Sequence, residues 1–319
     1  MVYAARHSLV RAAFHEIQNR NGMRIRDQMA RKKLFVIGAR GFLGQHVVRL
    51  AERWHDVWRG ERTPNGSPNS VQIDIADPAS VDWAFQGLRP ERVLLLAAIS
   101  DIDACEKSPA AAFATNAKGP ENVARACARF GARLLFTSSA AVFDGRKHGY
   151  RENDPRSPLS VYGKTKEAAE DLVAEILPSA IVLRFGLVIG FAGMLSTNAM
   201  LDRVVAKWRN GEAVEFSTRE ARNPIDAESL AQIAVDMLAL GGIEGTYHVG
   251  ASESVSRFEL AKMLAKRAGI SAGLVRPQDK IVPGRALRGE DHFLLTEKIE
   301  TECGFPVPTI NQVVERCFS

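Results

Sequence analysis

The sequence predicts an α/β fold, a parallel, doubly wound sheet followed by a smaller C-terminal lobe. Apolar, strand-like runs alternate with helical segments up to Phe185, a glycine-rich turn follows the first run, and the alternation ends after Gly186. Strands that alternate with helices indicate a parallel sheet with helices on both faces. Right-handed crossover connections leave few other ways to join such elements.

The first predicted strand, residues 34–37, is a short apolar run of the kind found in parallel strands that are buried on both faces. The other strands of the sheet are predicted at residues 56–58, 71–74, 92–97, 133–137 and 180–185. Helices are predicted at residues 42–53, from Asp77 onward, at 109–130 with an interruption near Gly119 and Pro120, and at 160–177. In the second half, helices are predicted at residues 198–210, 227–240 and 256–268 and near Gln312, with a short strand at 246–249.

The composition is that of a globular protein, since 46% of the 319 residues are hydrophobic and 25% are charged. The formal net charge is +5, but residues 1–33 hold eight basic and two acidic residues, so the remainder carries about one net negative charge. A basic surplus confined to one terminus does not indicate a nucleic-acid partner. No apolar run is long enough to span a membrane, and no metal site is predicted.

The cysteines indicate the compartment. Cys105, Cys127, Cys303 and Cys317 are scattered and form no C-x-x-C pair. In a chain of this length, the pattern predicts reduced, mostly buried thiols and a cytoplasmic location. Residues 1–30 show no continuous apolar segment typical of a secretory signal, and we interpret them as an N-terminal extension that is disordered or forms a short helix.

A glycine-rich turn joins the first predicted strand to the first helix. Glycines permit a tight turn, close approach of the backbone to a pyrophosphate and close packing of helix on strand, and the helix N-terminus then faces the anion. The spacing is G-x-x-G-x-x-G rather than the G-x-G-x-x-G of many dehydrogenases. Its position in a strand–turn–helix unit predicts a Rossmann-type dinucleotide site at Gly38, Arg40, Gly41, Phe42, Leu43 and Gly44.

The residues after the second predicted strand bear on the choice of dinucleotide. A carboxylate there binds the ribose diol of NAD, whereas arginines accept the extra phosphate of NADP. Arg59 and Arg62 flank Glu61, and Arg40 lies in the glycine turn. The sequence therefore favours NADP over NAD, although a solvated turn is an alternative reading of Arg59 and Arg62. The candidates for contact with the adenine, or else simple turn residues, are Asp74 and Ile75.

Tyr162 and Lys166 are four residues apart on a predicted helix, so their side chains share one face and can converge on one ligand. A phenol, with a pKa near 10, is a poor proton donor at neutral pH, and a nearby ammonium lowers that pKa. The spacing alone is weak evidence, because surface helices carry it by chance. It gains weight from the dinucleotide site before it and from Ser138 and Ser139 upstream.

With these features in order, the chain from residue 33 onward resembles the extended short-chain dehydrogenase/reductase family. Within that family it is most similar to the dTDP-4-dehydrorhamnose reductases and related sugar-nucleotide reductases. The stretches that carry the resemblance are residues 97–106, Asn116, 142–145, 150–155 and 158–164, and more weakly 223–226, 247–249 and 294–298.

The resemblance implies an NAD(P)-dependent oxidoreductase in which Tyr162 protonates a carbonyl oxygen during hydride transfer. It implies further that Lys166 hydrogen-bonds the nicotinamide ribose and lowers the pKa of Tyr162, and that Ser139 donates a hydrogen bond to the same oxygen. The cofactor contacts that it adds to the glycine turn are Ala97, Ala98, Asn116, Tyr162 and Lys166.

One segment departs from the rhamnose reductases, because Ser138-Ser139-Ala140-Ala141 stands where they have Ser-Thr-Asp-Tyr. The missing acid and aromatic residue leave the dTDP-sugar substrate open. The two alanines also argue against sugar-nucleotide 4,6-dehydratases, which need an acidic pair at these positions to eliminate water.

The sequence thus predicts a reductase of a carbonyl on a sugar nucleotide or similar small molecule. An NAD-dependent sugar-nucleotide 4-epimerase is one alternative, which the arginines after the second strand disfavour. A non-catalytic, nucleotide-binding regulatory subunit is another, against which the intact Ser139, Tyr162 and Lys166 weigh.

The domain organisation follows from the same reading. We expect an NAD(P)-binding domain at residues 31–185, to which a segment near 223–250 returns, and a mostly substrate-binding lobe at 186–319. A planar guanidinium suits a diphosphate, and Arg285 and Arg288, in a loop of this lobe, are the expected substrate contacts. Further candidates are Arg184 and Arg203. A homodimer is compatible with the sequence, which identifies neither the substrate nor the oligomeric state.

Overall fold

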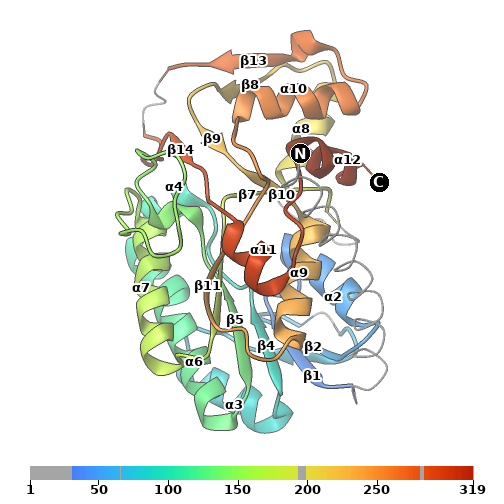
Figure 1. The fold of residues 1–319 in the computed structure, drawn as a ribbon. Coiled ribbons are helices and arrows are strands. Elements are labelled where there is room, and N and C mark those ends of the chain that lie inside the picture. Colours follow the sequence, from blue (N-terminus) through green and yellow to red (C-terminus); the bar gives the residue numbers. More distant parts are fainter. Residues whose placement is uncertain (1–30, 65, 193–198, 281–283, 319) are drawn as a thin grey trace, which may run out of the picture.

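A seven-stranded parallel sheet forms the centre of the larger lobe (Figure 1). The computed structural model describes residues 31–64, 66–192, 199–280 and 284–318, and the expected N-terminal extension lies outside them. The strand order is β11-β6-β5-β4-β1-β2-β3. The strands are β1 (Lys33–Ile37), β2 (Asp56–Glu61), β3 (Ser70–Gln72), β4 (Arg92–Leu95), β5 (Arg133–Thr137), β6 (Ile181–Phe185) and β11 (Gly245–Val249). All six pairings are parallel, and the predicted doubly wound fold is confirmed.

Helices cover both faces of this sheet, as alternation of side chains along a buried strand requires. In β1, Leu34 and Val36 belong to one hydrophobic core, and Phe35 and Ile37 belong to the other. The first core is closed by α2 (Phe42–Ala51), α9 (Ala227–Ala239) and α11 (Glu297–Cys303). The second core is closed by α3 (Pro78–Leu88), α6 (Gly119–Phe130) and α7 (Val161–Ile176).

The segment after β4 differs from the single interrupted helix that the sequence predicts. It consists of α4 (Ile102–Lys107), α5 (Pro109–Phe113), a π-helical turn η1 (Ala114–Lys118) and then α6. Pro120 lies in the first turn of α6, where a missing N–H is tolerated, so the irregularity falls one turn earlier than expected. Gly119 is required there, because a Cβ would lie 2.6 Å from Ile75 Cδ1.

The smaller lobe has its own core, formed around Trp208, Phe216 and Leu260. Its helices are α8 (Met200–Arg209), α10 (Arg257–Arg267) and α12 (Ile310–Arg316), and β8 (Val214–Ser217) pairs with β13 (Val275–Gln278). Short pairings that the sequence reading missed join β7 (Leu187–Ile189) to β10 (Pro224–Asp226), and β9 (Ala221–Arg222) to β12 (Val255–Ser256) and β14 (Asp291–His292). Strands of two to four residues are too short to show a period of hydrophobicity. The two remaining short turns are η2 (Ala140–Val142) and η3 (Ala272–Leu274).

The thiols and the helix lengths bear on location. All four cysteines are free and three of them are buried. Within the part of the chain that the structure describes, no helix is long and apolar enough to cross a membrane.

Candidate active site

The glycine turn after β1 packs more closely than side chains would allow. Gly38 has φ +95°, and a Cβ on it would lie 2.7 Å from the backbone nitrogen of Ala97. A Cβ on Gly44, in α2, would lie 2.2 Å from the carbonyl oxygen of Gly38. Gly41 precedes α2, whose first turn holds no acidic residue. The helix N-terminus is therefore open to an anion, and the turn fits a dinucleotide pyrophosphate.

The end of β2 shows which charged groups remain for the adenosine end of the cofactor. Glu61 is 5% exposed and its Oε2 accepts a hydrogen bond from Ser70 Oγ at 3.2 Å, so its carboxylate faces β3. Arg40 reaches from the glycine turn to the loop after β2 and donates from Nη1 to Thr63 O at 3.0 Å. Arg62 is exposed in the same loop. Of the three charged residues Arg40, Glu61 and Arg62 at the end of β2, the two arginines are thus exposed and the carboxylate is buried.

Arg59, predicted to bind the cofactor phosphate, has other partners in this structure. Its Nη2 is paired with Glu52 at the end of α2, and its Nη1 donates to Pro68 O at 2.7 Å. These two contacts engage the guanidinium with residues outside the glycine turn. The contact between Arg59 and a cofactor phosphate stays a prediction.

Asp74 and Ile75 take the turn and core positions that the sequence left as the alternative. Asp74 Oδ1 accepts the Ala76 N–H at 3.0 Å in a side-chain turn, and the carboxylate stays exposed. The side chain of Ile75 is buried against Gly119. Any contact between Ile75 and an adenine has to use its backbone.

Asn116, predicted as a cofactor contact, lies behind the site. It is fully buried in the π-helical turn, where its Oδ1 accepts the Ile99 N–H at 2.8 Å and its Nδ2 donates to Ile99 O at 2.9 Å. Nδ2 also lies 3.3 Å from Thr165 Oγ1 on α7. Asn116 therefore supports the partly exposed backbone after Ala97 and Ala98, instead of reaching a cofactor itself.

Ser139 and Tyr162 meet because two segments approach closely. Ser139 precedes η2 and its Oγ accepts the Ala141 N–H at 3.1 Å. Ser160 caps α7 by accepting the Gly163 N–H at 3.1 Å, which places Tyr162 in the first turn. A hydrogen bond joins the side chains of Tyr162 and Ser139. The structure thus brings together two of the three residues predicted to be catalytic.

Lys166 lies on the same face of α7, one turn further on. It is 2% exposed, its Nζ donates to Thr137 O at 3.0 Å, and Nζ lies 6.0 Å from the centre of the Tyr162 ring. Burial lowers the pKa of Lys166 to about 8, while the nearby Glu170 and Cys105 raise it.

The pKa of Tyr162 is raised, not lowered as predicted. Burial raises it to about 12, and the hydrogen bond from Ser139 lowers it in part. The expected lowering of this pKa by Lys166 is not seen, and its ammonium donates to Thr137 O, 6.0 Å from the centre of the Tyr162 ring. The phenol is therefore fully protonated at neutral pH.

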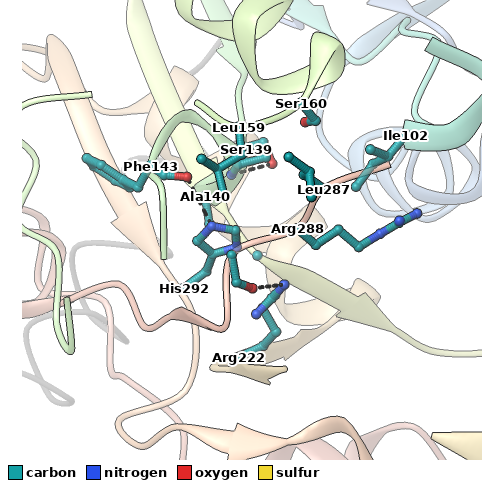
Figure 2. Close-up of a pocket in the computed structure, with 13 residues that line it drawn as sticks. Ile102, Ser139, Ala140, Phe143, Leu159, Ser160, Arg222, Leu287, Arg288 and His292 are labelled. Atoms are coloured by element: carbon teal, nitrogen blue, oxygen red, sulfur yellow. Dashed lines mark hydrogen bonds between the residues drawn. The ribbon is translucent and has the colours of Figure 1, made fainter. Parts of the chain in front are cut away.

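A pocket opens beside Ser139, between the two lobes. Its volume is about 70 Å³. Figure 2 shows Arg222 and His292 on one side of it and Ser139 with Leu159 on another. His292 Nε2 lies 3.0 Å from Phe143 O, and burial lowers the pKa of His292 to about 4, so its ring is neutral and holds the wall in place.

The predicted substrate arginines occupy different positions. Arg288 lines the pocket and binds Asp103 of α4 through both Nη atoms, at 2.9 and 3.2 Å. Arg285 lies outside the lining and is paired with Glu220 at 2.7 Å. The contact with Asp103 joins the C-terminal loop to the larger lobe.

Two further arginines from the sequence reading differ in burial. Arg184 is 4% exposed and paired with the buried Glu170, a position that does not favour contact with a substrate phosphate. Arg203, on α8, is exposed and does not line the pocket. Arg222, which does line it, was missed, although it directly precedes a stretch of the family resemblance.

Comparison with known proteins extends these observations. Residues 32–319 match the family model described as the RmlD substrate binding domain. The dTDP-4-dehydrorhamnose reductase of Mycobacterium tuberculosis is 33% identical over 252 residues, covering 77% of this chain and 79% of that protein. Methionine adenosyltransferase 2 subunit beta of Mus musculus is 30% identical over 277 residues, covering 85% and 82%.

A solved structure supports the same relationship. The dTDP-4-dehydrorhamnose reductase of Bacillus anthracis, determined in complex with NADP, superposes with a TM-score of 0.82 at 25% identity and covers 91% of this chain and 99% of that chain. The predicted fold and NAD(P)-dependent oxidoreductase class are confirmed. With its glycine turn, its Ser139–Tyr162–Lys166 group and a match that runs from residue 32 to the C-terminus, the chain belongs to the RmlD substrate binding domain family.

Proposed function

We propose that the protein reduces a carbonyl group on a sugar nucleotide with NADPH, and that Tyr162 is the proton donor. The observation that carries the proposal is the hydrogen bond between Tyr162 and Ser139 at the wall of the interlobe pocket, one helical turn from Lys166. The similarity to dTDP-4-dehydrorhamnose reductases supports the class of substrate.

Ser139, Tyr162 and Lys166 have different roles in the proposed reduction. A bound nicotinamide supplies a hydride to the carbonyl carbon. Ser139 Oγ accepts the Ala141 N–H, and its single O–H, which bonds Tyr162 in this structure, would turn to the carbonyl oxygen when a substrate binds. Tyr162, protonated at neutral pH, gives its proton to that oxygen as negative charge develops there. Lys166 donates to Thr137 O in this structure, and we expect its ammonium, 6.0 Å from the centre of the Tyr162 ring, to favour the phenolate once the proton has left.

The cofactor is NADPH in preference to NADH. Two observations support this: Arg40 and Arg62 lie at the loop after β2, where arginines accept a 2′-phosphate, and the carboxylate of Glu61 accepts from Ser70. We expect the backbone amides of Phe42 and Leu43, at the glycine turn, to bind the pyrophosphate of the cofactor. The free thiols fit a reducing, cytoplasmic setting. We also propose a homodimer, which a measurement of the molecular mass in solution would test.

The pocket beside the Asp103–Arg288 contact is too small for a sugar nucleotide. A volume of about 70 Å³ is below the roughly 300 Å³ or more of typical ligand pockets. We therefore expect the Arg288–Asp103 contact to open when a sugar nucleotide binds, which would make the guanidinium available to its diphosphate.

The test is oxidation of NADPH by the purified protein against a panel of nucleotide-linked keto-sugars. We expect turnover with at least one 4-keto sugar, tighter binding of NADPH than of NADH by calorimetry, and loss of turnover in Tyr162→Phe. Binding of NADPH without turnover of any sugar would instead support a subunit role, the class to which the similar methionine adenosyltransferase 2 subunit beta points.

A further inference from the structure

Glu170 lies one helical turn after Lys166 on α7, so Tyr162, Lys166 and Glu170 follow one another along one face. Its side chain is 5% exposed. Its Oε1 accepts hydrogen bonds from Ser138 Oγ and from Arg184 Nε at 2.8 Å. Its Oε2 accepts from Arg184 Nη2 at 2.6 Å and from Arg156 Nη1 at 3.1 Å. Four donors thus hold the carboxylate in one orientation.

Lys166 has no directly bonded acid within the described residues. Its Nζ donates to the neutral carbonyl of Thr137 and lies 4.9 Å from the centre of the Phe136 ring. Burial of an ammonium in such surroundings favours the neutral amine. The acidic groups close enough to oppose this are the carboxylate of Glu170, on its own helix, and the thiol of Cys105, on α4.

We propose that Glu170 is a positioning residue of the active site, whose fixed carboxylate keeps Lys166 charged beside Tyr162. The role rests on the proposed reduction, which requires Lys166 as an ammonium. No contact between Glu170 and substrate or cofactor is implied. The carboxylate acts through its charge, from the neighbouring turn on the same face of α7, without a direct ion pair to Lys166.

The arginines around Glu170 partly neutralise its charge and so reduce its electrostatic effect on Lys166. Arg184 of β6 is buried with it, and the ring of His248 on β11, 3.3 Å from Arg184, is neutral because burial and Arg184 lower its pKa to about 3. Arg156 is 25% exposed and is shared with Asp171 at 2.6 Å and Glu167 at 4.0 Å. Removing Arg156 therefore strengthens the field of Glu170 at Lys166, and removing the charge of Glu170 abolishes it.

Two substitutions must shift the titration of Lys166 in opposite directions. In Glu170→Gln we expect its pKa to fall by about one pH unit, and in Arg156→Gln to rise by about half a unit. Glu175→Gln makes the same chemical change at an exposed position on α7 and is the matched control, with no shift expected. A merely structural role predicts lower stability without opposed shifts.

The titration is measured directly by NMR on protein labelled at the lysine side chains, with the Lys166 signal identified by its loss in Lys166→Arg. The alkaline limb of the kcat/KM profile should move with it. Opposed NMR shifts in a protein without reductase activity uphold the role of Glu170 and reject the proposed function. Absence of a shift in folded Arg156→Gln overturns the role, even if Glu170→Gln fails to fold.

Discussion

Gly163 of α7 packs directly on the carbonyl oxygen of Ala141, so closely that a Cβ on Gly163 would lie 2.2 Å from that oxygen. The oxygen belongs to the backbone of η2, which cannot rotate away as a side chain could. This contact sets the distance between the helix that carries Tyr162 and the turn that begins with Ser139. The geometry of the proton donor therefore depends on a residue that has no side chain.

Gly163→Ala should separate these two segments. Overpacking of this kind costs about 1–3 kcal/mol in the free energy of unfolding. We expect a larger loss in kcat than in NADPH affinity, because the Tyr162–Ser139 hydrogen bond is lengthened while the glycine turn after β1 is untouched. Denaturant unfolding and steady-state kinetics measure the two effects. Gly87→Ala, in an open position on α3, is the control: it should leave kcat unchanged and raise the free energy of unfolding by about 0.5–1 kcal/mol, opposite in sign to Gly163→Ala.

Tyr162→Phe should remove the proton donor and leave the fold intact. We expect kcat to fall on the order of 10²–10⁴-fold, with NADPH affinity by calorimetry nearly unchanged. The variant keeps the ring against which Lys166 packs, so stability should alter little. Retention of full turnover would mean that another group protonates the substrate.

Lys166→Met should stabilise the protein at neutral pH while abolishing most activity. Burial lowers the pKa of Lys166 from 10.5 to about 8, so the folded state binds this proton less tightly than the unfolded state. The charged form thus opposes folding below pH 8, by roughly 3 kcal/mol at about 1.4 kcal/mol per pH unit. We expect Lys166→Met to raise the free energy of unfolding by about 2–3 kcal/mol at pH 7, and by less than about 1 kcal/mol at pH 10.

The sign of that pH dependence is the critical point. Between the folded and unfolded pKa values the unfolded wild type carries more protons, so the wild type gains stability from this residue as pH rises from 8 toward 10.5. A gain from Lys166→Met that stayed the same at both pH values would show that packing, not charge, had changed. Urea unfolding curves at pH 7 and pH 10 provide the comparison.

Arg288→Gln should weaken substrate binding more than Arg285→Gln. Arg288 lines the pocket and is held by Asp103 and the Ala286 carbonyl, whereas Arg285 is paired with Glu220 outside it. We expect KM for the sugar nucleotide to rise about tenfold or more for Arg288→Gln, with a smaller rise for Arg285→Gln. Equal effects on KM would contradict the assignment of the diphosphate to the pocket wall.

Much of the fold could be predicted from the sequence, because the signals that define its main strands and helices lie within those segments. The apolar run of β1, the glycine turn and the capping residues of α7 and α9 act within a few residues of chain. The strands of two to four residues in the smaller lobe were not predicted, because their pairing partners lie far away in the sequence. The helix interruption predicted near Gly119 and Pro120 lies one turn earlier for the same reason, since Asn116 of the π-helical turn is held by Ile99 and Thr165.

The sequence by itself determined the fold class, the nucleotide turn and the three residues Ser139, Tyr162 and Lys166, because motif spacing places them on a known type of scaffold. Only the tertiary structure decided what surrounds them. Burial and neighbouring charges set the pKa values of Tyr162 and Lys166. Tertiary contacts pair Glu61 with Ser70 and Arg59 with Glu52, and place Arg288, but not Arg285, in the pocket wall. These properties depend on which distant segments meet, and on how much water they exclude, and no local pattern of residues encodes either.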